Sequence, residues 1–116
     1  MSGPEKTYEN KIKKYLESQN CYFVKYFANR MTKAGIPDIL ACVNGYFVAI
    51  EVKAENGHPS ELQIYNVKKI NNEACGIAVI VRPSDFGNLK LMIDCLNDGR
   101  MTSAWRYARV INAKFF

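Results

Sequence analysis

The dipeptide Asn44-Gly45 constrains this chain more than any other feature of its sequence, because it separates two apolar segments, 38–43 and 46–53, by only two residues. Asn-Gly between such segments is the strongest short-range signal for a β-hairpin with a type I′ turn. In a two-residue hairpin, facing residues have numbers with a constant sum, and for this turn the sum is 89. Asp38 is therefore expected to face Glu51, with their Cβ atoms roughly 4.5–5.5 Å apart.

Two facing carboxylates in a hairpin need compensation. Lys53 lies two residues beyond Glu51 and so shares its face of the sheet. Like charges beside an apolar surface destabilise a sheet, and hard oxygen ligands suit a compensating Mg²⁺ or Mn²⁺ ion. Two alternatives stay open: a bulge that leaves both acids as solvated strand ends, or a neighbouring lysine that neutralises one of them.

A third carboxylate comes from the segment before the hairpin. A helix is expected over 7–19, where apolar residues such as Ile12 and Leu16 recur with the helical period. Glu9 borders this apolar stripe, and a carboxylate at the edge of a buried face needs a partner. That partner is either the carboxylate site or Lys13, one turn along the helix, in a pair worth only about 0.2–0.5 kcal/mol.

The rest of the chain reads as alternating strands and helices. Ser60-Glu61-Leu62-Gln63 has the form of a capping box that opens a helix to about Glu73, and Ser84 is expected to cap a helix through about Leu96. The tail over 102–116 interleaves aromatic and basic residues, which favours packing or a dimer contact over a base-stacking surface. Strands are expected over 21–27, 38–43, 46–53 and 77–81. This order predicts an α/β fold with a mixed sheet, in one domain over 1–116.

Charge and hydropathy narrow the class of protein. Sixteen basic and eleven acidic residues give a net charge of +5, which favours a polyanionic partner such as nucleic acid. No apolar run approaches the roughly 18–20 residues of a membrane span, and the polar start lacks the apolar segment of a signal peptide. The sequence therefore predicts a soluble, cytoplasmic protein.

At these residues the sequence resembles the PD-(D/E)xK nuclease superfamily. The matching pieces are Ile36-Pro37-Asp38, then Glu51-Val52-Lys53 after a hairpin, with Glu9 on the preceding helix. Finer details are similar to the VRR-Nuc branch and its small standalone phage and bacterial members: the segment 33–38, Gly57, and Ser60-x-x-Gln63. The resemblance covers about residues 7–81 and implies a restriction-endonuclease-like αβββαβ core.

The resemblance also implies an activity with assigned residues. It implies an Mg²⁺- or Mn²⁺-dependent DNA endonuclease in which Asp38, Glu51 and the main-chain carbonyl of Val52 ligate the metal. Glu9 would hold a metal-bound water or a second ion, and Lys53 would orient or deprotonate the attacking water. Further residues with weaker signals are Gln63 near the catalytic group and, as phosphate contacts, Arg30, Lys33 and His58.

Standalone members of that branch are expected to be homodimers that cut branched DNA, four-way (Holliday) junctions above all. The alternatives are a nuclease that prefers flap, single-strand or linear duplex DNA, and a non-catalytic nucleic-acid-binding module of the same fold. The charge distribution disfavours the binding module. Without Glu9, Asp38, Glu51 and Lys53 the chain has fifteen basic and eight acidic residues. Three acidic residues are therefore concentrated at the predicted site, where they would be unfavourable in a protein that only binds DNA.

Overall fold

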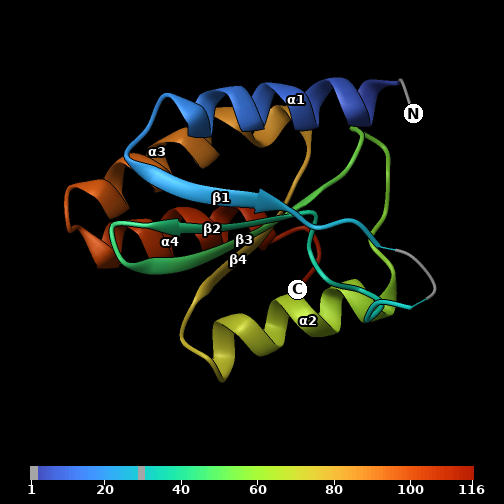
Figure 1. The fold of residues 1–116 in the computed structure, drawn as a ribbon. Coiled ribbons are helices and arrows are strands. Elements are labelled where there is room, and N and C mark those ends of the chain that lie inside the picture. Colours follow the sequence, from blue (N-terminus) through green and yellow to red (C-terminus); the bar gives the residue numbers. More distant parts are fainter. Residues whose placement is uncertain (1–2, 29–30) are drawn as a thin grey trace.

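The chain forms a four-stranded mixed sheet flanked by helices (Figure 1). A computed structural model describes residues 3–28 and 31–116. The elements along the chain are α1 (Pro4–Glu17), β1 (Cys21–Lys25), β2 (Ile39–Val43), β3 (Tyr46–Val52), α2 (Glu61–Asn72), β4 (Ile77–Val81), the 3₁₀ helix η1 (Pro83–Asp85), α3 (Phe86–Asn97) and α4 (Met101–Asn112). The predicted restriction-endonuclease-like α/β fold is confirmed.

The predicted hairpin is confirmed together with its register. Asn44 and Gly45 have φ angles of 51° and 85°, as both central residues of a type I′ turn require. The antiparallel ladder between β2 and β3 pairs Leu40 with Ala49 and ends at the pair of Ile39 with Ile50. Asp38 therefore lies one step beyond the ladder, on the side of the sheet that carries Glu51.

The strand order β1-β2-β3-β4 places β3 between an antiparallel and a parallel neighbour. The parallel pairing of β3 with β4 requires a crossover, which α2 provides. Glu51 stands opposite Ile80 in this pair, and the Lys53 amide donates to the Val81 carbonyl at 2.9 Å. A carboxylate near the end of the central strand is consequently enclosed by protein on both sides.

Helices cover the two faces of the sheet unequally. On one face, α1, α3 and α4 pack on a core that includes Ile39, Ile50 and Val79. On the other face, Val67 of α2 packs in a small cluster with Ala49 of β3 and with Ala78 and Ile80 of β4. Figure 1 shows α1 above the sheet and α2 below it. Among the described residues, no helix is both long and apolar enough to span a membrane.

The tail forms α4, which closes the outer edge of the sheet. The Asn112 side chain accepts from the Ile80 amide at 3.0 Å and donates to the Ala78 carbonyl at 2.9 Å. From α2, the Asn71 side chain accepts from the Ala78 amide at 2.8 Å and also donates to its carbonyl. These side chains satisfy backbone groups that an edge strand leaves unpaired. The interpretation of the tail as a packed segment is therefore confirmed.

Several predicted boundaries differ from the observed ones. The first helix ends at Glu17 instead of residue 19, and the hairpin strands begin at Ile39 and end at Val52, each one residue inside its predicted range. The first helix begins at Pro4 instead of residue 7, because proline suits a first helical turn even without apolar periodicity. The first strand ends at Lys25, two residues early. Ser84 does not cap a helix; it lies inside η1, and its amide and hydroxyl both donate to the Glu55 carboxylate.

Candidate active site

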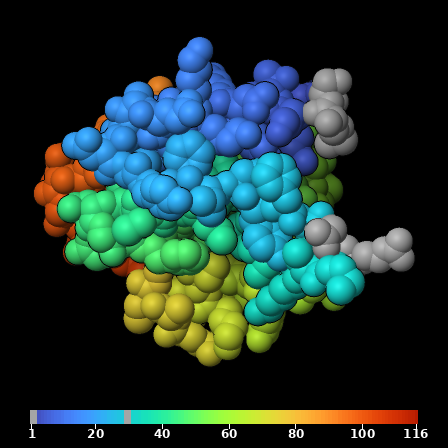
Figure 2. Space-filling model, viewed as in Figure 1, coloured from blue at the N-terminus to red at the C-terminus, as the bar shows by residue number. Residues whose placement is uncertain are grey.

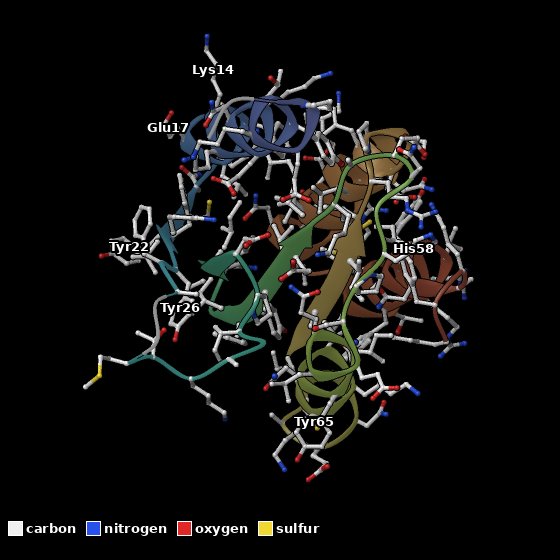
Figure 3. The ribbon with its side chains drawn as sticks, turned by 90° about the vertical axis from the view of Figure 1, so that its right-hand side faces the viewer. Lys14, Glu17, Tyr22, Tyr26, His58 and Tyr65 are labelled. Carbon is white, nitrogen blue, oxygen red and sulfur yellow. The ribbon has the colours of Figure 1, made fainter. Side chains whose placement is uncertain are left out.

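The candidate site lies where β1 and β3 end and β2 begins, at the side of the molecule that faces the viewer in Figure 3. In that view α1, marked by Lys14 and Glu17, is above the strand ends, and α2, marked by Tyr65, is below them. Glu9 enters this region from α1, and Gln63 enters it from α2. The site is thus assembled from both helical layers and the sheet.

Glu51 is the most deeply buried carboxylate of the site, with 2% of its surface exposed. Its Oε2 accepts from Gln63 Nε2 at 3.0 Å and lies 3.5 Å from Lys53 Nζ. Its Oε1 is buried and has no hydrogen-bond partner. Burial, followed by the negative charge of Asp38, raises the pKa of Glu51 to about 8, although Lys53 opposes the shift.

The side-chain amide of Gln63 has two roles, because its oxygen and its nitrogen contact different partners. It is the third residue of α2, and its Oε1 accepts from the Ser60 amide at 2.8 Å while its own amide donates to Ser60 Oγ at 3.1 Å. The capping box predicted from the sequence is therefore confirmed. Because Oε1 faces Ser60, the Nε2 group must face Glu51, so the cap sets the orientation of a hydrogen-bond donor in the site.

Asp38 is tied to both neighbouring strands. Its Oδ2 accepts from the Val52 amide at 2.9 Å, and its carbonyl accepts from the Tyr26 amide at 2.8 Å. Its Oδ1 lies 3.4 Å from Lys25 Nζ. Asp38 and Glu51 therefore lie near each other, as the register predicts. The contact of Val52 with Asp38 uses its amide, and the role expected for its carbonyl stays a prediction.

Glu9 is buried on α1, as its position beside the apolar stripe predicts, and three lysines surround it. Its Oε1 accepts from Lys25 Nζ at 2.8 Å, and its Oε2 lies 3.1 Å from Lys6 Nζ and 3.4 Å from Lys13 Nζ. Burial acts to raise the pKa of Glu9, but the hydrogen bonds and charges of Lys25 and Lys6 outweigh it and lower the pKa. The expected pair with Lys13 is present, as one contact among three.

Lys25 is the residue that sequence reasoning missed. Burial lowers its pKa, but the hydrogen bond to Glu9 and the charges of Asp38 and Glu9 dominate and raise it. Lys25 pairs with Ile39 across the β1–β2 ladder, and no turn signal connects these two strands in the sequence. The available clue was a lysine at the end of a short apolar strand segment, directly before a basic loop.

The carboxylate oxygens of the site suit a hard divalent cation at one position. The buried Oε1 of Glu51 is a carboxylate oxygen without a partner, and a second carboxylate lies beside it on Asp38. Over the described ranges 3–28 and 31–116, however, no three His, Cys, Asp or Glu side chains converge as metal ligands. Lys25 stands between Glu9 and Asp38, and Lys25 and Lys53 supply part of the compensation for the buried acids. The alternative of neutralisation by lysine is thus partly realised.

Two of the predicted phosphate contacts, Lys33 and His58, lie on the loops that precede β2 and follow β3. The Lys33 side chain is exposed, and its carbonyl accepts from the Tyr26 hydroxyl at 3.1 Å. His58 is exposed as well, and Figure 3 places it on the side opposite Tyr26 and Tyr22. Neither side chain is brought to the carboxylates in the way that Gln63 is. Arg30 lies outside the described residues.

Gly35 anchors the loop that leads into Asp38. Its φ of 79° is in the left-handed region, which favours glycine. A Cβ atom there would come within 2.7 Å of Asn66 Nδ2 and of Leu62 Cγ on α2. The loop can therefore approach α2 this closely only with glycine at this position, which helps to set the entry of the chain into β2.

Comparison with known families gives one informative match. The model described as archaeal Holliday junction resolvase (Hjc) matches residues 4–81, about two thirds of the chain. The matched range includes α1, the hairpin, α2 and β4, and with them Glu9, Asp38, Glu51, Lys53 and Gln63. No curated protein and no solved structure gives a significant match.

Proposed function

The chain belongs to the archaeal Holliday junction resolvase family, and from this premise we propose that it is a metal-dependent, structure-selective DNA endonuclease. Its substrate in this proposal is branched DNA, with four-way junctions first, and its metal is Mg²⁺ or Mn²⁺. The resemblance to PD-(D/E)xK nucleases is confirmed at the level of this resolvase family, whereas the narrower VRR-Nuc assignment stays a prediction. The proposal treats residues 1–116 as one nuclease domain that works on DNA in the cytoplasm of a bacterial or phage-infected cell.

One observation carries the proposal: the buried, partnerless Oε1 of Glu51 beside the carboxylate of Asp38. A buried carboxylate oxygen without a partner is costly, because it has lost its hydration without any replacement. A cation held by these oxygens removes that cost.

The residues around the metal position divide the remaining tasks. When bound, Mg²⁺ or Mn²⁺ lowers the pKa of water and neutralises charge on the phosphate under attack. Gln63 holds Glu51 through its Oε2, which leaves Oε1 for the metal. Lys53 Nζ, 3.5 Å from Glu51 Oε2, is placed to orient the attacking water and to stabilise the charge that develops on the phosphate.

The electrostatic balance also suits a polyanionic substrate. The three carboxylates of the site lie beside four lysines, namely Lys6, Lys13, Lys25 and Lys53. The cluster thus carries no excess of negative charge that would repel DNA phosphates. A non-catalytic DNA-binding module could use the same lysines, but it would have no need for the buried acid pair.

We also propose that two copies associate through the part of the sheet that α2 leaves bare. On this face Tyr22, Val24 and Phe47 are 74%, 43% and 46% exposed, and cross-strand pairing aligns them beside Leu40 and Cys42. Figure 2 shows this side of the molecule, with β1 and the hairpin at the surface between α1 and α2. A second copy is the fitting occupant, because a four-way junction has two equivalent strands to cut and a two-fold dimer supplies two equivalent sites.

Cleavage of a labelled four-way junction tests the activity. The parent is expected to cut with Mg²⁺ or Mn²⁺ and to stop when EDTA is added. Asp38→Asn and Lys53→Ala are expected to bind the junction and to lose cleavage. Flap, single-strand and linear duplex DNA in the same assay rank the substrates, and binding of every substrate without metal-dependent cutting would instead support the binding module.

A further inference from the structure

Lys25 connects two carboxylates that come from different layers of the fold. Its Nζ lies 2.8 Å from Oε1 of Glu9 on α1 and 3.4 Å from Oδ1 of Asp38 at the start of β2. The side chain is largely enclosed, with 18% of its surface exposed. A cation shared by two carboxylates from separate elements is an arrangement that a bridging metal ion can also adopt.

We propose that the Lys25 ammonium replaces a second metal ion in this site, so that each protomer binds one divalent cation, between Asp38 and Glu51. This inference rests on the proposed function, since it presupposes the metal position at those two residues. It makes Lys25 a positioning residue that holds Glu9 and Asp38 in place without an ion from solution.

The oxygens of Glu9 support the replacement. Oε1 faces Lys25, and Oε2 faces both Lys6 and Lys13, so each oxygen of Glu9 already has a cationic partner. A divalent cation at Glu9 would have to bind among these ammonium groups, and like charges repel at such distances. Glu9 is therefore satisfied by the protein itself.

Glu51 differs from Glu9, because the protein supplies partners for only one of its two oxygens. Oε2 of Glu51 has donors in Gln63 and Lys53, but its buried Oε1 has none. On Asp38, Oδ2 already accepts from the Val52 amide, and Oδ1 has its contact with Lys25. One cation position thus remains to be filled, between the free Oε1 of Glu51 and Asp38, because the Val52 amide is uncharged and leaves Oδ2 of Asp38 a second lone pair. The position between Glu9 and Asp38 is already occupied by Lys25.

A lysine at this position differs from a metal in a useful way. An ammonium group is a compact point charge with three donors, attached to the chain at all ion concentrations. The charge between Glu9 and Asp38 is therefore present before any divalent cation binds. Binding of a single divalent cation then completes the site.

Titration of the 116-residue chain with Mn²⁺ in the absence of DNA tests the proposal. Isothermal titration calorimetry is expected to give one ion per protomer for the parent and two for Lys25→Met. Lys25→Arg keeps the charge and should stay at one, and the double variant Lys25→Met with Glu9→Gln should return to one. Lys13→Met is the matched control: it removes a lysine from Glu9 that has no contact with Asp38, and it should stay at one.

Electron paramagnetic resonance of the bound Mn²⁺ provides a second readout. Two ions in one site broaden each other's signal by dipolar coupling, so broadening is expected for Lys25→Met and not for the parent. Circular dichroism melts establish which variants fold, and Lys25→Gln carries the same expectation if Lys25→Met does not fold.

The outcomes separate the two proposals. One ion in both the parent and Lys25→Met overturns the role of Lys25 and leaves the metal site of the proposed function intact. Two ions in the parent also overturn the role of Lys25. A parent that binds no Mn²⁺ overturns the metal site of the proposed function itself, and the inference about Lys25 fails with it.

Discussion

Gln63 donates through Nε2 to Oε2 of Glu51 at 3.0 Å, while its Oε1 accepts from the amide of Ser60 at 2.8 Å. One side chain thus caps α2 and orients the buried acid on β3. The sequence predicts both roles for Gln63, the capping box and, with a weaker signal, a place near the catalytic group. In the structure a single amide serves both, since its two ends face different partners.

The two roles of Gln63 can be separated by substitution. Gln63→Glu keeps an acceptor for the Ser60 amide but removes the donor to Glu51 and adds a negative charge beside it. We expect single-turnover cleavage of a four-way junction to fall about 10–100-fold, as when groups that orient metal ligands are lost. The unfolding free energy should change by less than the ~1 kcal/mol that loss of a helix cap costs.

Ser60→Ala is the matched control for that variant. It removes the hydroxyl that caps α2 and leaves the amide donor that holds Gln63 Oε1. We expect a loss of about 1 kcal/mol in stability with cleavage close to that of the parent. Equal cleavage by Gln63→Glu and the parent would mean that Gln63 acts only as a cap.

Glu51 gives the metal-free protein a specific pH dependence. Its folded-state pKa is raised from an ordinary value of 4.5 to about 8, so between these pH values the folded state binds more protons than the unfolded state. The stability that this group contributes is therefore present at low pH and is lost as the pH rises towards 8, by at most about 1.4 kcal/mol per pH unit. Glu51→Gln lacks this component and should gain stability relative to the parent as the pH rises.

Urea unfolding in EDTA at pH 5, 6.5 and 8 measures this difference. Addition of Mg²⁺ at pH 8 should stabilise the parent more than Glu51→Gln, because a ligand that binds the folded state stabilises it. Parallel stability curves for the two proteins would show that Glu51 is ionised throughout this pH range.

Asn112 should contribute strongly to stability although it lies outside the matched family segment. Asn112→Ala leaves the Ile80 amide without its partner at a closed sheet edge. The expected cost is about 1–3 kcal/mol in the free energy of unfolding, measured by urea denaturation. The exposed Asn72 provides a control, since Asn72→Ala should change stability by no more than about 0.5 kcal/mol. Similar small effects at both positions would argue against α4 as the cover of the edge.

The exposed face of the sheet that carries Tyr22, Val24 and Phe47 should determine whether the protein is a dimer or a monomer in solution. Light scattering of the parent at micromolar concentration is expected to give about 26 kDa, twice the chain mass of 13.2 kDa. The double variant Val24→Lys with Phe47→Lys should give the monomer mass, because it places charges in an apolar contact. Val110→Lys, on the exposed side of α4, should remain dimeric. A monomeric parent would remove the dimer from the proposal and leave the nuclease activity to be judged by cleavage.

Local signals in the sequence were sufficient for part of the site. The Asn44-Gly45 turn determines the hairpin register and so places Asp38 on the side of Glu51, because facing positions follow from a two-residue turn alone. The capping box at Ser60 likewise depends on residues only three positions apart. Such features are readable because the chain between the partners is too short to allow other arrangements.

Only the tertiary structure decided which side chains meet from distant segments. Lys25 reaches Glu9 and Asp38 because α1, β1 and β2 pack together, although 16 and 13 positions separate it from them along the chain. Asn112 contacts Ile80 although 32 positions separate them, and no local sequence pattern predicts either this contact or those of Lys25. Chain segments of that length can close in many ways, and the choice among them is made by burial of the shared core, which no short stretch of sequence contains.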